Sequence, residues 1–369
     1  MTHRPRPARA GAFLALSLAA GAFWGAPAPC RADFKTGTFS IVAYDSVTQE
    51  LGVAVQSKYF SVGCAVPWAE GGVGAVATQA NVNVSLGPMA LAMLRTGMSA
   101  AEVMRSLAAA DSGWEGRQVG IVDAHGNSVT WTGKRCLDWA GGETGPGFTC
   151  QGNILAGPAV VANMARAYRE GRGELAERLI LALEAAQAAG GDKRGMQSAA
   201  LIVTRPSATN PQFRERYVDL RVEDHKTPIK ELRRVWQIHQ GFHLAGQHLT
   251  YAAEFDAAGL PEKARFERER VGDILRAALK RGERDASVLN GLAWSCATND
   301  IYLNDAVLAA ERATEIEPRN IDILDTLAEA HYRSGHAEKA IEVESRAATL
   351  DPKSQYLRDQ IERFRGGVK

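Results

Sequence analysis

The chain has 369 residues, and its 43 basic and 42 acidic side chains leave a net charge of +1. This balance excludes strong global attraction to nucleic acid or to an anionic membrane. The tryptophans are scattered and lack the basic interleaving of a nucleic-acid surface, so no nucleic-acid partner is expected. The length suffices for two domains.

The first 32 residues have the pattern of an export signal. Three arginines precede an apolar run at 11–26, and residues 30–32 (Cys-Arg-Ala) offer small side chains at the −3 and −1 positions of a cleavage site. The apolar run is too short to span a membrane and is followed by two prolines. We therefore expect an exported protein, periplasmic or extracellular, without a membrane span.

Five cysteines occur, four of them after the signal. An oxidising compartment would permit a bridge between Cys136 and Cys150 across a glycine-rich segment. The chain has no Cys-x-x-Cys pair that would suggest zinc. His239 and His243 lie four residues apart, but Gln240 stands where a zinc protease would need glutamate, so a packed or solvated helix is expected and no metal site.

Between residues 38 and 222 the hydrophobic period switches between that of strands and that of helices. Strands are predicted at 39–44, 51–56, 73–78, 118–123, 128–132, 148–155, 198–204 and 217–222. Helices are predicted at 88–95, 99–110, 159–168 and 174–189, the second opened by the capping box Ser99-Ala-Ala-Glu102. This order predicts two stacked sheets with a helix pair outside each. The first hairpin is apolar on both faces, as a sheet covered on both sides requires.

After a helix at 231–239 the composition is helical and charged to the C-terminus. An internal repeat occurs there, since Leu289–Ala293 recurs 35 residues later as Leu324–Ala328 and Pro318 recurs 34 residues later as Pro352. This spacing is typical of tetratricopeptide repeats, with plain helical hairpins as the alternative. We expect the repeats to hold a protein partner or to position a substrate.

Thr38 opens the first predicted strand directly after Gly37. If the bond between them is cut, Thr38 gains a free amine of pKa about 7.7 to 8.0, which can act as base for its own hydroxyl nucleophile. The alternative is that Gly37 ends a turn and that Thr38 merely starts a strand. Lys35 and Gly37 would make a poor signal-peptidase site, so exposure of Thr38 needs a second event, such as attack of its hydroxyl on the Gly37 carbonyl.

The register of the first hairpin predicts two further candidate residues close to Thr38. If Tyr44 pairs with Leu51, Thr38 lies opposite Ser57 with both side chains on one face, and Lys58 is adjacent. A nearby ammonium would disfavour protonation of the Thr38 amine and could stabilise an oxyanion. A register slip would turn Ser57 away, and a solvated strand end is the alternative for Lys58.

Amides and charged groups near strand ends are candidates for binding a polar amide or carboxylate substrate. They are Gln79, Asn81, Asn83, Gln151, Asn153, Asp192, Arg194 and Gln197. Each could instead cap a turn or satisfy buried backbone groups.

A series of sequence blocks runs in order from residue 38 to residue 225. TFSIVAYDSVTQELGVAVQSKYFSVG is followed by VPWA, GVGAVATQA, QVGIVDAHG, CQGNILAGP, GDKRGMQSAAL and RYVDLRVEDH. Together these blocks resemble domain-of-unknown-function family 1028, placed among the Ntn (N-terminal nucleophile) hydrolase-like folds and without an agreed substrate. Members of the family often begin Met-Thr-Phe-Ser, which would expose threonine after methionine removal, whereas this chain carries a leader and residues 33–37 in front of Thr38.

These features predict an exported α+β protein. Its expected parts are a signal peptide at 1–32, a short propeptide or linker at 33–37, a four-layer αββα Ntn-hydrolase-like sandwich at 38–240, and an all-α, tetratricopeptide-like repeat domain at 241–369. The expected function is cofactor-free hydrolysis of a small amide or peptide, with Thr38 as nucleophile and Ser57 and Lys58 assisting. The alternative is a non-catalytic binding or scaffold protein that acts through its repeats, because a fold alone does not decide function. The sequence does not identify the substrate, and it does not decide whether the protein forms a homo-oligomer.

Overall fold

A computed structural model of the protein describes residues 37–206 and 214–366. The signal peptide expected at 1–32 and most of the linker expected at 33–37 lie outside these residues. All described residues belong to one compact unit.

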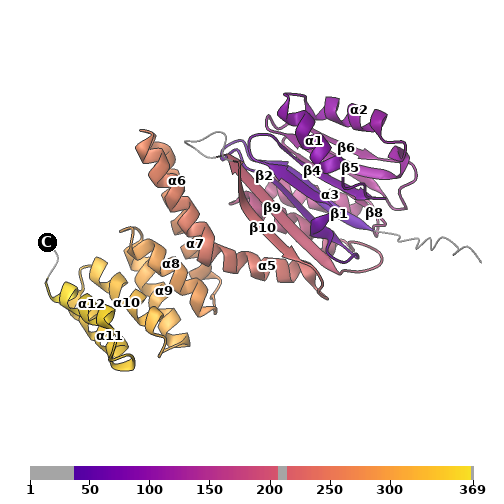
Figure 1. Ribbon diagram of the computed structural model, residues 1–369. Coiled ribbons are helices and arrows are strands. Elements are labelled where there is room, and N and C mark those ends of the chain that lie inside the picture. Colours follow the sequence, from indigo (N-terminus) through magenta and orange to yellow (C-terminus); the bar gives the residue numbers. More distant parts are fainter. Residues whose placement is uncertain (1–36, 207–213, 367–369) are drawn as a thin grey trace, which may run out of the picture. The chain divides into compact units, whose positions relative to one another are not determined.

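Strands of the described residues form two antiparallel sheets (Figure 1). The strands are β1 (Thr38–Tyr44), β2 (Leu51–Ser57), β3 (Pro67–Glu70), β4 (Gly74–Ala80), β5 (Arg117–Asp123), β6 (Ser128–Thr132), β7 (Gly141–Gly145), β8 (Phe148–Asn153), β9 (Ser198–Pro206) and β10 (Arg214–Val222). The larger sheet has the order β10-β9-β2-β1-β8-β7, and the smaller sheet has the order β3-β4-β5-β6. Contacts of β1 and β2 with β4, and of β8 with β5, stack one sheet on the other.

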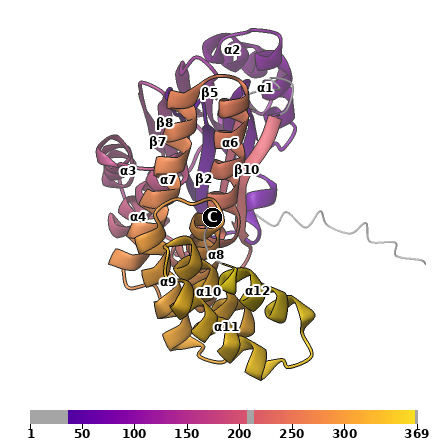
Figure 2. The same cartoon turned by 90° about the vertical axis from the view of Figure 1, so that its left-hand side faces the viewer.

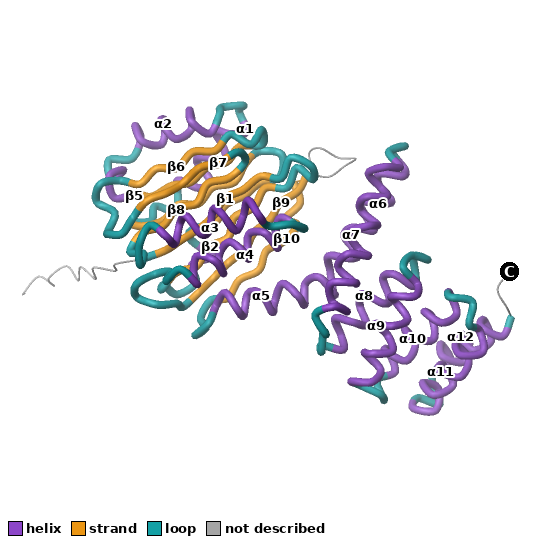
Figure 3. Tube along the Cα trace, turned by 180° about the vertical axis from the view of Figure 1, so that it is seen from behind, coloured by secondary structure: helices purple, strands orange, loops and turns teal. Residues whose placement is uncertain are grey.

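A helix pair covers the outer face of each sheet. Helices α1 (Leu86–Arg95) and α2 (Ala100–Ala110) pack on β4, β5 and β6. Helices α3 (Ala159–Glu170) and α4 (Leu175–Ala188) pack on β1, β2, β8 and β9, and Figure 3 shows them in front of the larger sheet. The predicted order of strands and helix pairs is confirmed, as is the capping box, in which the Ser99 side chain accepts from the Glu102 backbone.

The side chains of β1 alternate between two apolar layers. Phe39 and Ile41 pack with α3 and α4, whereas Val42 packs between the two sheets. Because successive side chains of a strand point to opposite faces, Thr38 and Ser40 share the inter-sheet face with Val42. The strand is therefore apolar on both sides along most of its length, and its polar residues meet the smaller sheet.

Two edge strands were not predicted from the sequence. β7 lies in the glycine-rich segment and pairs with β8, and the short β3 pairs with β4. Strand prediction depends on an alternation of apolar and polar residues, and neither strand shows it. β7 contains only glycine, glutamate and threonine, and β3 is only four residues long. Each of the two forms by backbone pairing with the strand beside it.

The bridge that the sequence would permit between Cys136 and Cys150 is not formed, because both residues are free thiols. Cys150 is fully buried in the core beneath α3 and α4. The Cys136 thiol instead donates to the carbonyl of Arg117, at the start of β5 in the other sheet. The two side chains thus belong to different layers.

The C-terminal region is helical. Helix α5 (Pro228–His239) continues through a π-helical turn, Gln240–Leu244, into α6 (Ala245–Ala257), so the boundary expected after residue 240 falls within an unbroken helical stretch. Figure 2 shows α6 beside α7 (Pro261–Lys280). Further helices follow as α8 (Ala286–Ala297), α9 (Leu303–Ile316), α10 (Ile321–Arg333), α11 (Ala337–Leu350) and α12 (Gln355–Arg365).

Candidate functional site

The site is built around the first residues of β1 and the last residue of β2. The register pairs Tyr44 with Leu51 and therefore Thr38 with Ser57, as predicted from the hairpin. The Thr38 and Ser57 hydroxyl oxygens lie 3.0 Å apart, and both side chains are buried. This end of the inter-sheet layer thus holds two hydroxyls in direct contact.

The carbonyl oxygen of Gly37 receives two hydrogen bonds. The Ser57 hydroxyl donates to it over 2.6 Å, and Nη2 of Arg194 donates over 2.7 Å. A hydroxyl has one proton to donate, so Thr38 must donate its own proton to the Ser57 oxygen. Two donors on one carbonyl, one of them charged, are the arrangement that stabilises a developing oxyanion.

Asp192 holds Arg194 in this position. Its carboxylate accepts from the Arg194 backbone N–H at 2.9 Å, from Nε at 3.1 Å and from Nη2 at 2.7 Å. It also accepts from the backbone N–H of Lys58 at 3.1 Å, and its side chain is fully buried. Asp192 is tied to Leu155 by a backbone bridge, so the carboxylate is fixed from several sides.

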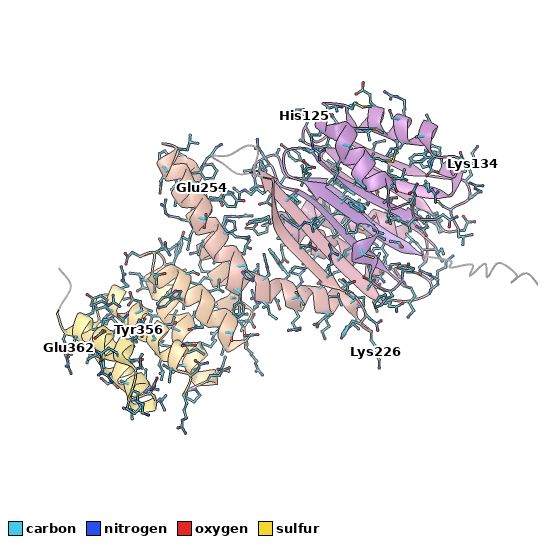
Figure 4. All side chains as sticks on the ribbon, in the orientation of Figure 1. His125, Lys134, Lys226, Glu254, Tyr356 and Glu362 are labelled. Carbon is cyan, nitrogen blue, oxygen red and sulfur yellow. The ribbon has the colours of Figure 1, made fainter. Side chains whose placement is uncertain are left out.

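Lys58 contributes to the site by its backbone, whereas its side chain extends to the surface. Its Nζ donates to the Met196 carbonyl over 3.3 Å. Lys58 and Met196 line an open groove of about 590 Å³ together with Gln197, Asp224, His225 and Lys226. Figure 4 labels Lys226, where β10 gives way to α5.

The amides of Gln79, Gln151 and Asn153 join one buried network between the sheets. Ser40 donates to Gln79 over 2.6 Å and accepts from the Gln151 amide over 2.7 Å. The Oε1 of Gln118 accepts from both Gln79 and Asn153, at 2.9 and 2.8 Å. Because buried polar groups must be satisfied, this network fixes the two sheets against each other behind Thr38. Gln118 was not singled out from the sequence, although a glutamine beginning an apolar strand is a usable signal.

Asn81, Asn83 and Gln197 make other contacts. The Asn83 amide donates to Asp111 over 3.3 Å, and hydrogen bonding from Arg117 holds the pKa of that carboxyl at about 2. The carbonyl of the exposed Asn81 also accepts from Arg117. The Gln197 amide donates to Asp224 over 3.2 Å, in the surface groove. Of the residues predicted from the sequence, the structure thus brings together Thr38, Ser57, Asp192 and Arg194. Gln79 lies behind them, with its amide nitrogen 3.4 Å from the Thr38 carbonyl oxygen.

A cavity of about 20 Å³ lies beside the hydroxyl pair. Such a volume accommodates about one water molecule. Its polar walls are Thr38, Ser57 and Gln79, and its apolar walls include Ala80 and Val82. Ala80 has a φ of 68°, a left-handed conformation that alanine seldom adopts and that occurs often at functional sites.

The described residues contain neither a cluster of metal ligands nor a membrane-spanning helix. Within residues 37–206 and 214–366, no group of three histidine, cysteine, aspartate or glutamate side chains is arranged to hold a metal ion. Over the same stretches, none of the helices combines the length and the apolar character needed to cross a membrane.

Comparison with known proteins gives a family match. The sequence model described as "Family of unknown function (DUF1028)" matches residues 38–232. Among solved structures, the chain is similar to the crystal structure of protein SPO2555 from Silicibacter pomeroyi, described as family-model DUF1028, with 30% identity, a TM-score of 0.51, and coverage of 55% of this chain and 86% of that chain. A comparison with curated proteins finds no match. Thr38, Ser57, Asp192 and Arg194 all lie within the residues that match the family.

Proposed function

The chain belongs to the DUF1028 family, whose function is unknown, and we propose that it is a self-processing amide hydrolase with the Thr38 hydroxyl as its nucleophile. The observation that carries this proposal is the pair of donors on the Gly37 carbonyl, Ser57 and Arg194, at the bond that must break. The resemblance to Ntn-hydrolase-like folds supports it, because the helix, sheet, sheet, helix order and a threonine at the start of the first strand agree with that class.

Self-cleavage requires each proton to move over a short distance. As the Thr38 oxygen attacks the Gly37 carbonyl carbon, its proton passes to the Ser57 oxygen, and the Ser57 proton passes to the Gly37 oxygen. Collapse of the tetrahedral intermediate breaks the bond between the Gly37 carbonyl carbon and the Thr38 nitrogen, and the proton that the Gly37 oxygen releases as its carbonyl re-forms passes to that nitrogen. Water then hydrolyses the resulting ester and leaves a Gly37 carboxylate and a free Thr38 amine.

After cleavage the same residues would act on an external amide. The Thr38 amine serves as base for its own hydroxyl, since its ordinary pKa of about 7.7 to 8.0 lies near neutral pH. Ser57 and Arg194 hold the substrate carbonyl oxygen, and Asp192 positions Arg194. The cavity beside Thr38 gives space for the water that hydrolyses the ester.

The remaining predicted residues have supporting places in this proposal. Lys58 and Gln197 line the groove that opens next to the site and would contact the distal part of a polar substrate. Gln79, Gln151 and Asn153 position β1 through their network, and Asn81 and Asn83 border the loop after β4. The protein would act after export, as the N-terminal pattern indicates.

The helical region would bind a protein partner in the manner of tetratricopeptide repeats. Helices α8 to α11 form two successive hairpins at the predicted repeat spacing. The exposed side chains of Trp294 and Leu308, on α8 and α9, favour this binding role because large apolar groups on a surface often mark a contact. The same two exposed side chains favour the rival function, a scaffold protein in which the bond between Gly37 and Thr38 is never cleaved.

The intact mass of the exported protein separates the two functions. A hydrolase begins at Thr38, and its Thr38→Ala variant retains the five residues 33–37. A Thr48→Ala variant, altered in the β1–β2 turn, serves as control and should be processed like the natural chain. A natural chain that begins at Asp33 and hydrolyses no member of an amide library would leave only the scaffold.

A further inference from the structure

Gly37 lies against a wall formed by the Asp192 carboxylate. A Cβ atom at residue 37 would lie 2.7 Å from Oδ1 and 2.8 Å from both Cγ and Oδ2 of Asp192. Cβ atoms in real proteins essentially never approach heavy atoms within 3.0 Å. Any side chain at this position must therefore displace either the carboxylate or the backbone that carries the scissile bond.

The carboxylate is poorly able to move. Each of its oxygens accepts hydrogen bonds, from Arg194 and from the backbone N–H of Lys58. The side chain is fully buried, and the backbone bridge to Leu155 holds the residue that carries it. Moving Asp192 would also move Arg194, which donates to the Gly37 carbonyl. The wall and the oxyanion donor are thus one rigid assembly.

We propose that Asp192 restricts the acyl side of the cleaved bond to glycine, so that the substrates of the mature enzyme are peptides or amides with an unsubstituted glycyl α-carbon at that position. This inference rests on the proposed function. An ester on the Thr38 oxygen has the same attacking atom and the same carbonyl donors whether its acyl group comes from Gly37 or from an external amide. The α-carbon next to that carbonyl then faces Asp192 in both cases.

The reaction is an ordinary acyl transfer. The Thr38 oxygen forms an ester with the glycyl carbonyl carbon, the amide C–N bond breaks, and the amine leaves with a proton. Water hydrolyses the ester, releasing the glycyl carboxylic acid and restoring the Thr38 hydroxyl. An alanyl substrate would require the same steps with its methyl group inside the contact distance of the Asp192 carboxylate.

The first test uses two substrates and no change in the site. The chain is produced with methionine directly before Thr38, so that methionine removal exposes the threonine. We expect kcat/KM for N-acetylglycine para-nitroanilide to exceed that for N-acetylalanine para-nitroanilide by about 10- to 100-fold, the size of an overpacking penalty expressed as a rate. Equal values within about threefold would overturn the proposal.

The second test is a double-mutant cycle on self-cleavage of the precursor. Gly37→Ala should slow cleavage by a similar factor in the natural chain and in Asp192→Asn, because asparagine keeps the shape of the wall. In Asp192→Ala the wall is removed, and glycine and alanine at residue 37 should be cleaved at nearly equal rates. The same factor in all three backgrounds would refute the collision. The cleavage rates with glycine and with alanine at residue 37 are compared within each background. A general loss of stability or of Arg194 positioning therefore lowers both rates alike and leaves their ratio unchanged.

A third measurement keeps this inference separate from the proposed function. If the natural chain neither cleaves itself nor hydrolyses either anilide, the proposed hydrolase fails, and the wall is then judged in the Thr38→Ala chain by thermal unfolding. Gly37→Ala should lower Tm by at least about 2 °C there, and should do so much less when Asp192→Ala is also present. Equal Tm values with glycine and alanine at residue 37 would show that no wall exists.

Discussion

We expect the stability of the protein to decrease between about pH 6.5 and pH 9 because of one buried histidine, His248 on α6. Its Nδ1 lies 2.7 Å from Glu267 on α7, and its Nε2 lies 3.2 Å from Glu174 at the start of α4 and 3.1 Å from the Tyr217 hydroxyl on β10. The side chain is 1% exposed. The histidine therefore joins the helical region to the α/β layers through Glu174 and Tyr217, and joins α6 to α7 through Glu267.

The direction of the pH effect follows from these neighbours. Burial opposes the charged imidazole, but Glu174 and Glu267 outweigh it and raise the pKa of His248 to about 9. The folded pKa lies above the ordinary value of 6.5, so the stabilisation is fully present below pH 6.5 and is lost as the pH rises through 9. The loss amounts to about 3 kcal/mol of unfolding free energy. Burial raises the pKa of nearby Glu50 to about 7. This carboxyl therefore also makes the stability decrease as the pH rises, over a lower pH range than His248 does.

Urea unfolding at several pH values measures this loss. The natural chain should lose about 3 kcal/mol between pH 6 and pH 9.5, and His248→Gln should remove most of that decrease while lowering stability at pH 6. The exposed His243, in the preceding π-helical turn, provides the control, because His243→Gln should leave the decrease in place. A decrease that is equally steep in His248→Gln and in the natural chain would refute the assignment to this histidine.

Three further predictions concern the site and the packing of helices. Arg194→Ala should slow self-cleavage about 100-fold or more, as loss of an oxyanion donor does, whereas Arg166→Ala on the exposed side of α3 should not, both followed by intact mass. Ser99→Ala removes the N-cap of α2 and should lower the unfolding free energy by about 1 kcal/mol in urea. Gly291→Ala places a Cβ 2.5 Å from the Gly241 carbonyl oxygen and should destabilise α8 against the π-helical turn by about 1–3 kcal/mol, whereas Gly246→Ala, with open space around it, should be neutral or stabilising. A tolerated Gly291→Ala, with unchanged Tm, would contradict that close crossing.

The sequence by itself determined the local structure and the place of Thr38, the proposed nucleophile. Strand and helix periods, the capping box at Ser99 and the pairing of Tyr44 with Leu51 depend on residues close in the chain, and the structure agrees with them. The hairpin register then placed Ser57 opposite Thr38, because a short antiparallel pair leaves little freedom once its turn is set. The sequence blocks at 38–225 also indicated the family, and the family model matches residues 38–232.

Only the tertiary structure decided how distant residues complete the site. Arg194 reaches the Gly37 carbonyl across 157 residues of chain, and Gln118 joins the network behind Thr38 from the other sheet. Edge strands such as β7 likewise form because a neighbouring strand supplies their partners. No local period records such contacts, since they depend on the order in which strands are placed in a sheet and on which faces the two sheets press together.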